Sequence, residues 1–352
     1  MKRIFFSFVF ILGLLINTDA GAQEGEQNLH ETGRTFMRQG DFDNAILVLT
    51  RALQQQPKNA EIRKDLVMSH YLKRDYAKAK DQVEPLIESD DADVVAYQIA
   101  GNIYKALEEV KSAEKMYKRA LRKFPNSGAL RSEYGELLWA NKDYSAIDEW
   151  EKGIKLDPSF AGNYYNAALY YFYTKDKVWA LVYGEIFVNM ESLTERAAAM
   201  KQILYKAYKE KLFADLGTTK NDEKNNSEFA KSFLDVMNKQ SGIVNRGITT
   251  ETLTMIRTRF ILEWYAKYAN KFPFRLFDYQ RQLLQEGMFE AYNQWLFGTV
   301  ENLAAYDNWT KTHNQAYSNF TTFQKGRIFK ELHFFDEPER NINSYQIMAG
   351  LL

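Results

Sequence analysis

The sequence contains no cysteine among its 352 residues. This absence excludes disulfide bonds, cysteine-ligated zinc, iron–sulfur clusters and thiol nucleophiles, and it excludes lipid attachment through an N-terminal cysteine. Proline is also scarce, with 6 residues, whereas Leu, Ala, Lys, Glu and Tyr are abundant, which predicts an all-α fold. Basic and acidic side chains balance at 46 each. Because no net charge draws the chain to a polyanion, we expect no nucleic-acid partner.

The residue patterns of known catalytic sites are missing as well. The four histidines, His30, His70, His313 and His333, form neither H-x-x-x-H nor H-E-x-x-H, so zinc binding on a helix is not indicated. The sequence also lacks a G-x-S-x-G nucleophile elbow and both glycine-rich phosphate loops. We therefore predict no metal, no cofactor and no catalytic residues, and we expect that the protein is not an enzyme.

The N-terminus carries the features of a signal peptide. Lys2 and Arg3 precede an apolar run over residues 4–16, and Ala20-Gly21-Ala22 provides a small-residue cleavage site before Gln23. The alternative is a membrane anchor, but a spanning helix needs about 20 apolar residues and this run is shorter. We predict that residues 1–22 are cleaved between Ala22 and Gln23. The mature chain is then expected to be exported to the periplasm or beyond, and to be soluble without a membrane span.

The chain repeats itself with a period of about 34 residues. One set of small, aromatic and proline residues recurs two periods later in the chain. Part of the set occurs a third time after almost two further periods, one residue short of the full spacing. The first set is Gly33, Phe36, Ala45, Ala52 and Pro57; the second is Gly101, Tyr104, Ala113, Ala120 and Pro125; the third is Ala168, Tyr171 and Ala180.

This spacing resembles that of the tetratricopeptide repeat (TPR) family. Its pattern places small residues at repeat positions 8, 20 and 27, aromatic residues near them, and proline at position 32. The resemblance covers five units, at about 26–59, 60–93, 94–127, 128–160 and 161–193. The second and fourth units match less well: the turn of the second is expected to be one residue short, and the fourth has a one-residue slip. The resemblance implies structural roles for Gly33, Ala45, Ala52, Pro57, Gly101, Ala113, Ala120, Pro125, Gly135, Pro158, Ala168 and Ala180.

The resemblance implies a right-handed solenoid of helical hairpins, in which small residues let neighbouring helices approach closely. Proline ends the second helix of a unit because it lacks an N–H group and crowds the preceding turn. A single hairpin cannot bury its apolar face, so the units must stack. Another helical-hairpin solenoid of similar period remains the alternative.

The second half lacks this period and is expected to be a non-repeat helical C-terminal region. Residues 194–216 are interpreted as a capping helix or a degenerate sixth unit, and the polar run 217–227 as a flexible loop. Apolar spacing predicts helices over residues 251–271, 276–297 and 300–327 within an aromatic-rich region, 228–335. Its aromatic rings form either a packed core, which we expect, or a ligand-stacking surface. Residues 336–352 are expected to be a tail.

In TPR solenoids the first helices of the units line a concave groove, so the resemblance implies where a partner binds. The residues that fall on this groove are Arg34, Arg38, Gln98, Asn102, Lys105, Trp139, Tyr165 and Phe172. The groove is expected to be polar and mildly basic at one end and aromatic at the other. His30 and Arg34 replace the Lys and Asn of the clamp that captures chaperone tails, so that partner is not expected.

Two functions remain open from the sequence. The first is an exported scaffold or adaptor that binds a peptide or protein in the groove. The second is a ligand-binding or catalytic domain at residues 228–335 that the repeats present. The sequence does not indicate the partner's identity, the pathway or the oligomeric state.

Overall fold

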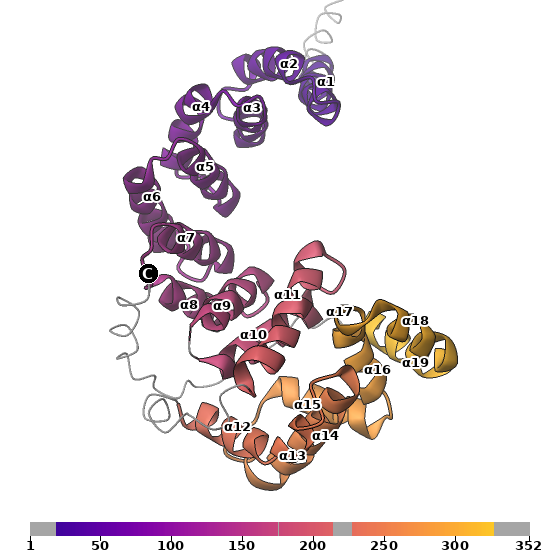
Figure 1. Ribbon diagram of the computed structural model, residues 1–352. Helices are drawn as coiled ribbons and strands as arrows, with labels where there is room; N and C mark the ends of the chain where they lie inside the picture. The colour runs from indigo at the N-terminus through magenta and orange to yellow at the C-terminus, as the bar shows by residue number, and fades with distance from the viewer. Residues whose placement is uncertain (1–18, 175, 214–226, 327–352) are drawn as a thin grey trace, which may run out of the picture. The chain divides into compact units, whose positions relative to one another are not determined.

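The computed structural model describes residues 19–174, 176–213 and 227–326. Every regular element in these ranges is a helix, so the predicted all-α fold is confirmed there (Figure 1). The chain forms two compact units, residues 1–124 and 125–352. Most of the predicted signal segment, nearly all of the predicted flexible loop and the whole predicted tail lie outside the described residues.

The first unit consists of three successive helical hairpins. Its helices are α1 (Asp19–Arg38), α2 (Phe42–Gln55), α3 (Ala60–Leu72), α4 (Tyr76–Glu88), α5 (Val94–Ala106) and α6 (Val110–Lys123). Each odd-numbered helix packs against the even-numbered helix that follows it, and α2 contacts α3 as α4 contacts α5. Apolar side chains between the first two hairpins, among them Leu49, Ile62 and Leu66, are almost completely buried. The hairpins therefore stack, as the repeat pattern predicts.

The turns inside the first four hairpins share one structure. A residue with a left-handed backbone follows the first helix at Gly40 (φ 76°), Arg74 (66°), Glu108 (58°) and, in the second unit, Lys142 (59°). The next N–H bonds back to a carbonyl at Phe36, His70, Tyr104 and Leu138, at 2.9–3.0 Å, which is the Schellman motif of helix C-termini. These positions are spaced by one full period each, without interruption. The turn of the second unit is therefore not one residue short, and that expectation is wrong.

Small residues stand where two helices touch. A Cβ atom added to Gly33 would lie 2.6 Å from the Leu49 side chain, and one added to Gly101 would lie 1.9 Å from the Tyr117 hydroxyl. The six repeat alanines are buried, with exposures of 0–2%: Ala45, Ala52, Ala113, Ala120, Ala168 and Ala180. The period follows from close contact between helices, because a larger side chain at these positions would push the pair apart.

The second unit continues the hairpins and then departs from them. Its first four helices are α7 (Gly128–Ala140), α8 (Ala146–Leu156), α9 (Ala161–Tyr173) and α10 (Lys177–Met190). The helices α11 (Glu195–Lys206), η1 (Ala207–Leu212), α12 (Glu228–Asn238), α13 (Ser241–Val244), α14 (Thr250–Lys267), α15 (Arg275–Gln285), α16 (Phe289–Asn293), η2 (Gln294–Gly298), α17 (Thr299–Glu301), α18 (Leu303–Thr312) and α19 (Asn314–Lys325) complete it.

Two long helices expected near the C-terminus are each divided. The helix expected over 276–297 ends at Gln285, and Gly287 (φ 70°) turns the chain before α16. Glycine adopts this left-handed conformation without the steric cost of a Cβ atom. The helix expected over 300–327 breaks at Asn302, whose side chain accepts a hydrogen bond from the Ala305 N–H and so begins α18. It breaks again at His313.

The aromatic residues of the C-terminal helices form the predicted core. Phe229 lies 5.3 Å from Trp264 and 5.4 Å from Phe274 between ring centroids, and Phe260 lies 5.2 Å from Phe277. All five rings are at most 4% exposed. The edge-to-face geometry of these three pairs is that of favourable aromatic packing.

A buried ion pair joins these C-terminal helices to α10. The Arg257 guanidinium of α14 donates to Glu185 Oε1 of α10, and the two side chains are 2% and 4% exposed. The same oxygen accepts from Gln280 Nε2 at 2.6 Å and from the Tyr292 hydroxyl at 2.7 Å. Burial, the largest single influence, lowers the pKa of Arg257, but the Glu185 carboxylate and the hydroxyl groups of Tyr208 and Tyr292 together outweigh it, so the pKa is raised. The C-terminal helices are therefore fixed to the last hairpin of the repeats.

Candidate partner-binding face

The first helices of the three hairpins in the first unit lie next to one another. Helix α3 contacts α1 on one side and α5 on the other. We call the surface that these helices share the α1–α3–α5 face. Its polar residues are His30, Arg34 and Arg38 on α1, Glu61, Lys64 and Asp65 on α3, and Gln98, Asn102 and Lys105 on α5.

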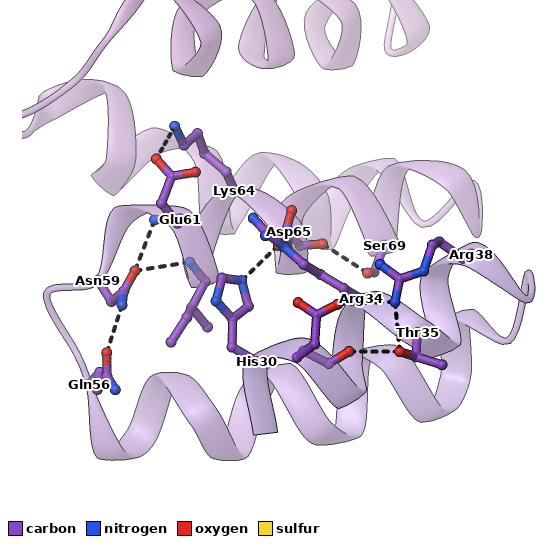
Figure 2. Close-up of polar contacts among 12 residues, drawn as sticks. His30, Arg34, Thr35, Arg38, Gln56, Asn59, Glu61, Lys64, Asp65 and Ser69 are labelled. Atoms are coloured by element: carbon purple, nitrogen blue, oxygen red, sulfur yellow. Dashed lines mark hydrogen bonds and ion pairs between the residues drawn. The ribbon is translucent and has the colours of Figure 1, made fainter. Parts of the chain in front are cut away.

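Asp65 is the centre of the contact between α1 and α3. Figure 2 shows that His30 and Arg34 both reach toward it from α1. His30 Nε2 lies 2.7 Å from Asp65 Oδ2, and Arg34 Nε donates to the same oxygen at 2.7 Å. The hydrogen bond to Asp65 is the main reason that the pKa of Arg34 is raised. The Arg34 side chain nevertheless stays 41% exposed, so this pair lies at the surface.

Arg38 on α1 and Lys64 on α3 are also paired with carboxylates. Arg38 Nη2 donates to Glu31 Oε1 at 3.1 Å and to Thr35 Oγ1 at 2.8 Å. Lys64 Nζ lies 2.6 Å from Glu61 Oε1 and 2.8 Å from Asp93 Oδ2. Asp93 also accepts from the Ala96 N–H and so caps α5. The mildly basic character expected for this region is therefore largely neutralised by carboxylates of the face itself.

The three predicted residues of α5 lie on one side of the helix. Gln98, Asn102 and Lys105 are four and three residues apart, which places them on the same helical face, and each is partly exposed. Within the described residues, Lys105 forms no ion pair, unlike Arg34, Arg38 and Lys64. Of these four cations, Lys105 is the least neutralised, so it is the one that would attract a negatively charged group of a partner most strongly.

The predicted aromatic residues belong to the second unit. Trp139 on α7 remains partly exposed and packs on Tyr170 with 5.2 Å between ring centroids. Tyr165 on α9, also partly exposed, lies 4.9 Å from the Phe187 ring, and the Arg196 guanidinium lies 5.3 Å from its centroid. Phe172 is only 9% exposed, which leaves its ring little surface for a ligand.

The sequence interpretation did not include Asp65, Glu61 or Asp93 among the site residues. Asp65 stands 31 residues after Arg34 and 35 after His30, and Asp93 stands 29 after Lys64. Each pair thus joins opposite charges that are about one repeat apart. A search for such pairs at the repeat period would have found all three contacts.

The alternative site, in the C-terminal helices, has little room. Glu185, Tyr208, Arg257 and Gln280 line a small cavity whose other walls are apolar. About 10 Å³ is open to the centre of a water molecule, which is near the least volume that holds one water. The groups that converge there bind one another, as Glu185 does with Arg257 and Gln280.

Residues 19–174, 176–213 and 227–326 contain no group of three acidic or histidine side chains arranged to hold a metal ion. No helix in these ranges has the length and apolar character needed to cross a bilayer.

The fold and this face define the first part of the chain as a stack of helical hairpins with a regular period. Two family models of the tetratricopeptide repeat match it, one at residues 36–101 and the other at residues 100–159. Residues 36–159, in the first half of the chain, are therefore tetratricopeptide repeats.

Solved structures of similar fold are distant in sequence. A thermophilic TPR protein from Thermus thermophilus is 17% identical, with 51% of this chain and 98% of that chain covered and a TM-score of 0.42. PilF of Pseudomonas aeruginosa is 17% identical, with 53% and 86% covered and a TM-score of 0.45. A tetratricopeptide repeat protein from Parabacteroides merdae is 13% identical, with 69% and 88% covered and a TM-score of 0.43. No curated protein matches the chain.

Proposed function

We propose that this chain is an exported scaffold or adaptor that binds a peptide segment of another protein on the α1–α3–α5 face. The observation that carries the proposal is the TPR match at residues 36–159, because repeats of this family present adjacent first helices to protein partners. The signal-like segment at residues 1–22 supports export to the periplasm of a Gram-negative bacterium.

The chemistry of the face suits a peptide ligand. Arginine, lysine and amide side chains offer hydrogen-bond donors to a peptide backbone, and the α5 residues Asn102 and Lys105 offer a position for an acidic group. Partly exposed aromatic rings such as Trp139 and Tyr165 give the second unit apolar anchors, which are common at the centres of interfaces.

Affinity capture of the full chain with a matched set of variants tests the proposal. Replacing Arg34, Arg38 and Lys105 together by Gln should reduce capture of the specific partner at least tenfold, measured by quantitative mass spectrometry. A control that replaces Arg51, Lys115 and Arg122 by Gln makes the same charge change on exposed residues of α2 and α6. Equal capture by both triple variants would reject binding on the α1–α3–α5 face.

Export is tested separately by the intact mass of the protein recovered from the periplasm. A chain that begins at Gln23 supports the proposal, whereas a chain that retains residues 1–22 contradicts signal cleavage.

A further inference from the structure

The contact with Asp65 uses only one of the hydrogen-bond donors of the Arg34 guanidinium. Arginine carries five N–H donors, and Arg34 uses its Nε donor for Asp65 Oδ2. Within the described residues its two terminal nitrogen atoms, Nη1 and Nη2, donate no hydrogen bond. Since the side chain is 41% exposed, these donors face solvent at the α1–α3–α5 face.

Asp65 also removes the net charge of this position. The carboxylate lies 2.7 Å from both His30 and Arg34, so an incoming carboxylate or phosphate would meet repulsion from Asp65 as well as attraction from Arg34. Asp65 cannot be displaced cheaply, because it is part of the same chain and is held at a high effective concentration. An uncharged acceptor meets the free Nη donors without that repulsion.

We propose that Asp65 makes Arg34 selective for uncharged carbonyl acceptors, those of an extended peptide backbone, and keeps acidic groups away from this position. Acidic groups of the partner are then directed to α5, where Asn102 and Lys105 bond to no carboxylate among the described residues. The repulsive element is part of the recognition, as it is in many specific interfaces. This inference rests on the proposed function for its ligand class.

The charge selectivity is testable without a partner, with inorganic phosphate as the probe. Phosphate is titrated at constant ionic strength into the full chain, and the Arg34 Nε–Hε signal is followed by NMR. Wild-type protein should show no saturable shift of this signal. The D65N variant should bind phosphate at Arg34 at least about tenfold more tightly, the order expected when one charge a few ångströms away is removed.

Two further variants isolate the cause. Glu61→Gln removes the same charge one helical turn from Asp65 but leaves Arg34 with its partner, and it should behave as wild type. The double variant D65N/R34Q lacks the Arg34 signal, so phosphate binding to it and to D65N is also followed by the backbone amide signals of residues 30–38, and the double variant should lose the gain. D65S serves in place of D65N if circular dichroism shows that D65N is unfolded.

Saturable phosphate binding at Arg34 in wild-type protein would overturn the proposal, as would an equal gain in Glu61→Gln. So would a gain in D65N that survives loss of Arg34, or no gain in folded D65N or D65S. None of these results depends on partner capture, so failure here leaves the scaffold function standing, and failure of capture leaves the selectivity at Arg34 measurable.

Discussion

Arg257→Met tests whether the buried ion pair is what fixes the C-terminal helices to α10. The substitution keeps most of the side-chain volume beside the rings of Phe289, Tyr292 and Phe297, whose centroids lie 5.3–5.5 Å from the guanidinium. It removes the charge opposite Glu185, which is itself 4% exposed. Breaking a buried pair on one side costs about 3–5 kcal/mol, because the remaining charge is left without its partner. We expect R257M to lower the free energy of unfolding by that amount.

The double variant R257M/E185Q separates the stranded charge from lost packing. The new amide at position 185 would still accept hydrogen bonds from Gln280 and Tyr292, which now bond to Glu185 Oε1, but would carry no charge. We expect the double variant to recover about 2 kcal/mol relative to R257M, a coupling typical of residues in direct contact. Urea unfolding followed by tryptophan fluorescence measures the wild type and the single and double variants.

A surface pair provides the control. Lys271 and Glu228 pair at 2.8 Å with side chains 60% and 70% exposed, and exposed pairs contribute little to stability. Lys271→Met should therefore leave the unfolding midpoint unchanged. A loss below about 1 kcal/mol in R257M, or a double variant whose loss equals the sum of the two single losses, would refute the reasoning.

Three further predictions concern the turns, the helix contacts and one partly buried amine. Glu108→Gly should stabilise the chain by about 0.5–1 kcal/mol in urea unfolding. The left-handed backbone costs a non-glycine residue about 1–2 kcal/mol, and the greater conformational entropy of glycine in the unfolded state offsets part of the gain. Destabilisation would contradict this prediction. Gly101→Ala should destabilise by about 1–3 kcal/mol, since its Cβ would overlap the buried Tyr117 side chain, and an unchanged melting temperature would count against close contact there. Lys201 donates to the Trp295 carbonyl at 2.8 Å, and burial lowers its pKa from 10.5 to about 8. Between pH 8 and 10.5 the unfolded chain therefore binds more protons than the folded chain. The free energy of unfolding should rise over that range by up to about 3 kcal/mol relative to the Lys201→Met variant. If the two proteins show parallel pH profiles, the pKa of the amine is not lowered.

The repeats were predictable because their determinants are local and periodic. Gly33, Gly101 and the buried alanines recur at the repeat period since each marks a contact between helices that follow one another in the chain. The turn at Arg74 was misread because it carries a left-handed backbone on a residue that gives no such signal, unlike Gly40.

The attachment of the C-terminal helices could not be predicted in this way. Glu185 and Arg257 are 72 residues apart and belong to no period, so nothing in either neighbourhood points to the other. The division of the chain into compact units, at residues 124 and 125, likewise falls inside the repeats. The signal peptide and the boundaries of the repeat units stay predictions.

The candidate face was predictable by position but not by charge. Arg34, Arg38 and Lys105 lie on the first helices that the resemblance indicates, yet two of the three have carboxylate partners and one does not. Asp65, which neutralises the charge of Arg34, belongs to the neighbouring repeat. A prediction made one unit at a time therefore misses this pair.

The Glu185–Arg257 pair makes the hairpins of the second unit unequal in local stability, because it stabilises α10 directly. A stack of hairpins usually frays from both ends, since each unit is held only by its neighbours. In the second unit the last hairpin is held by a helical core as well, so α10 should exchange its amide hydrogens only in the rarest openings, while protection declines toward α7. A protease would then cut the hairpins of the second unit more readily at α7 than at α10.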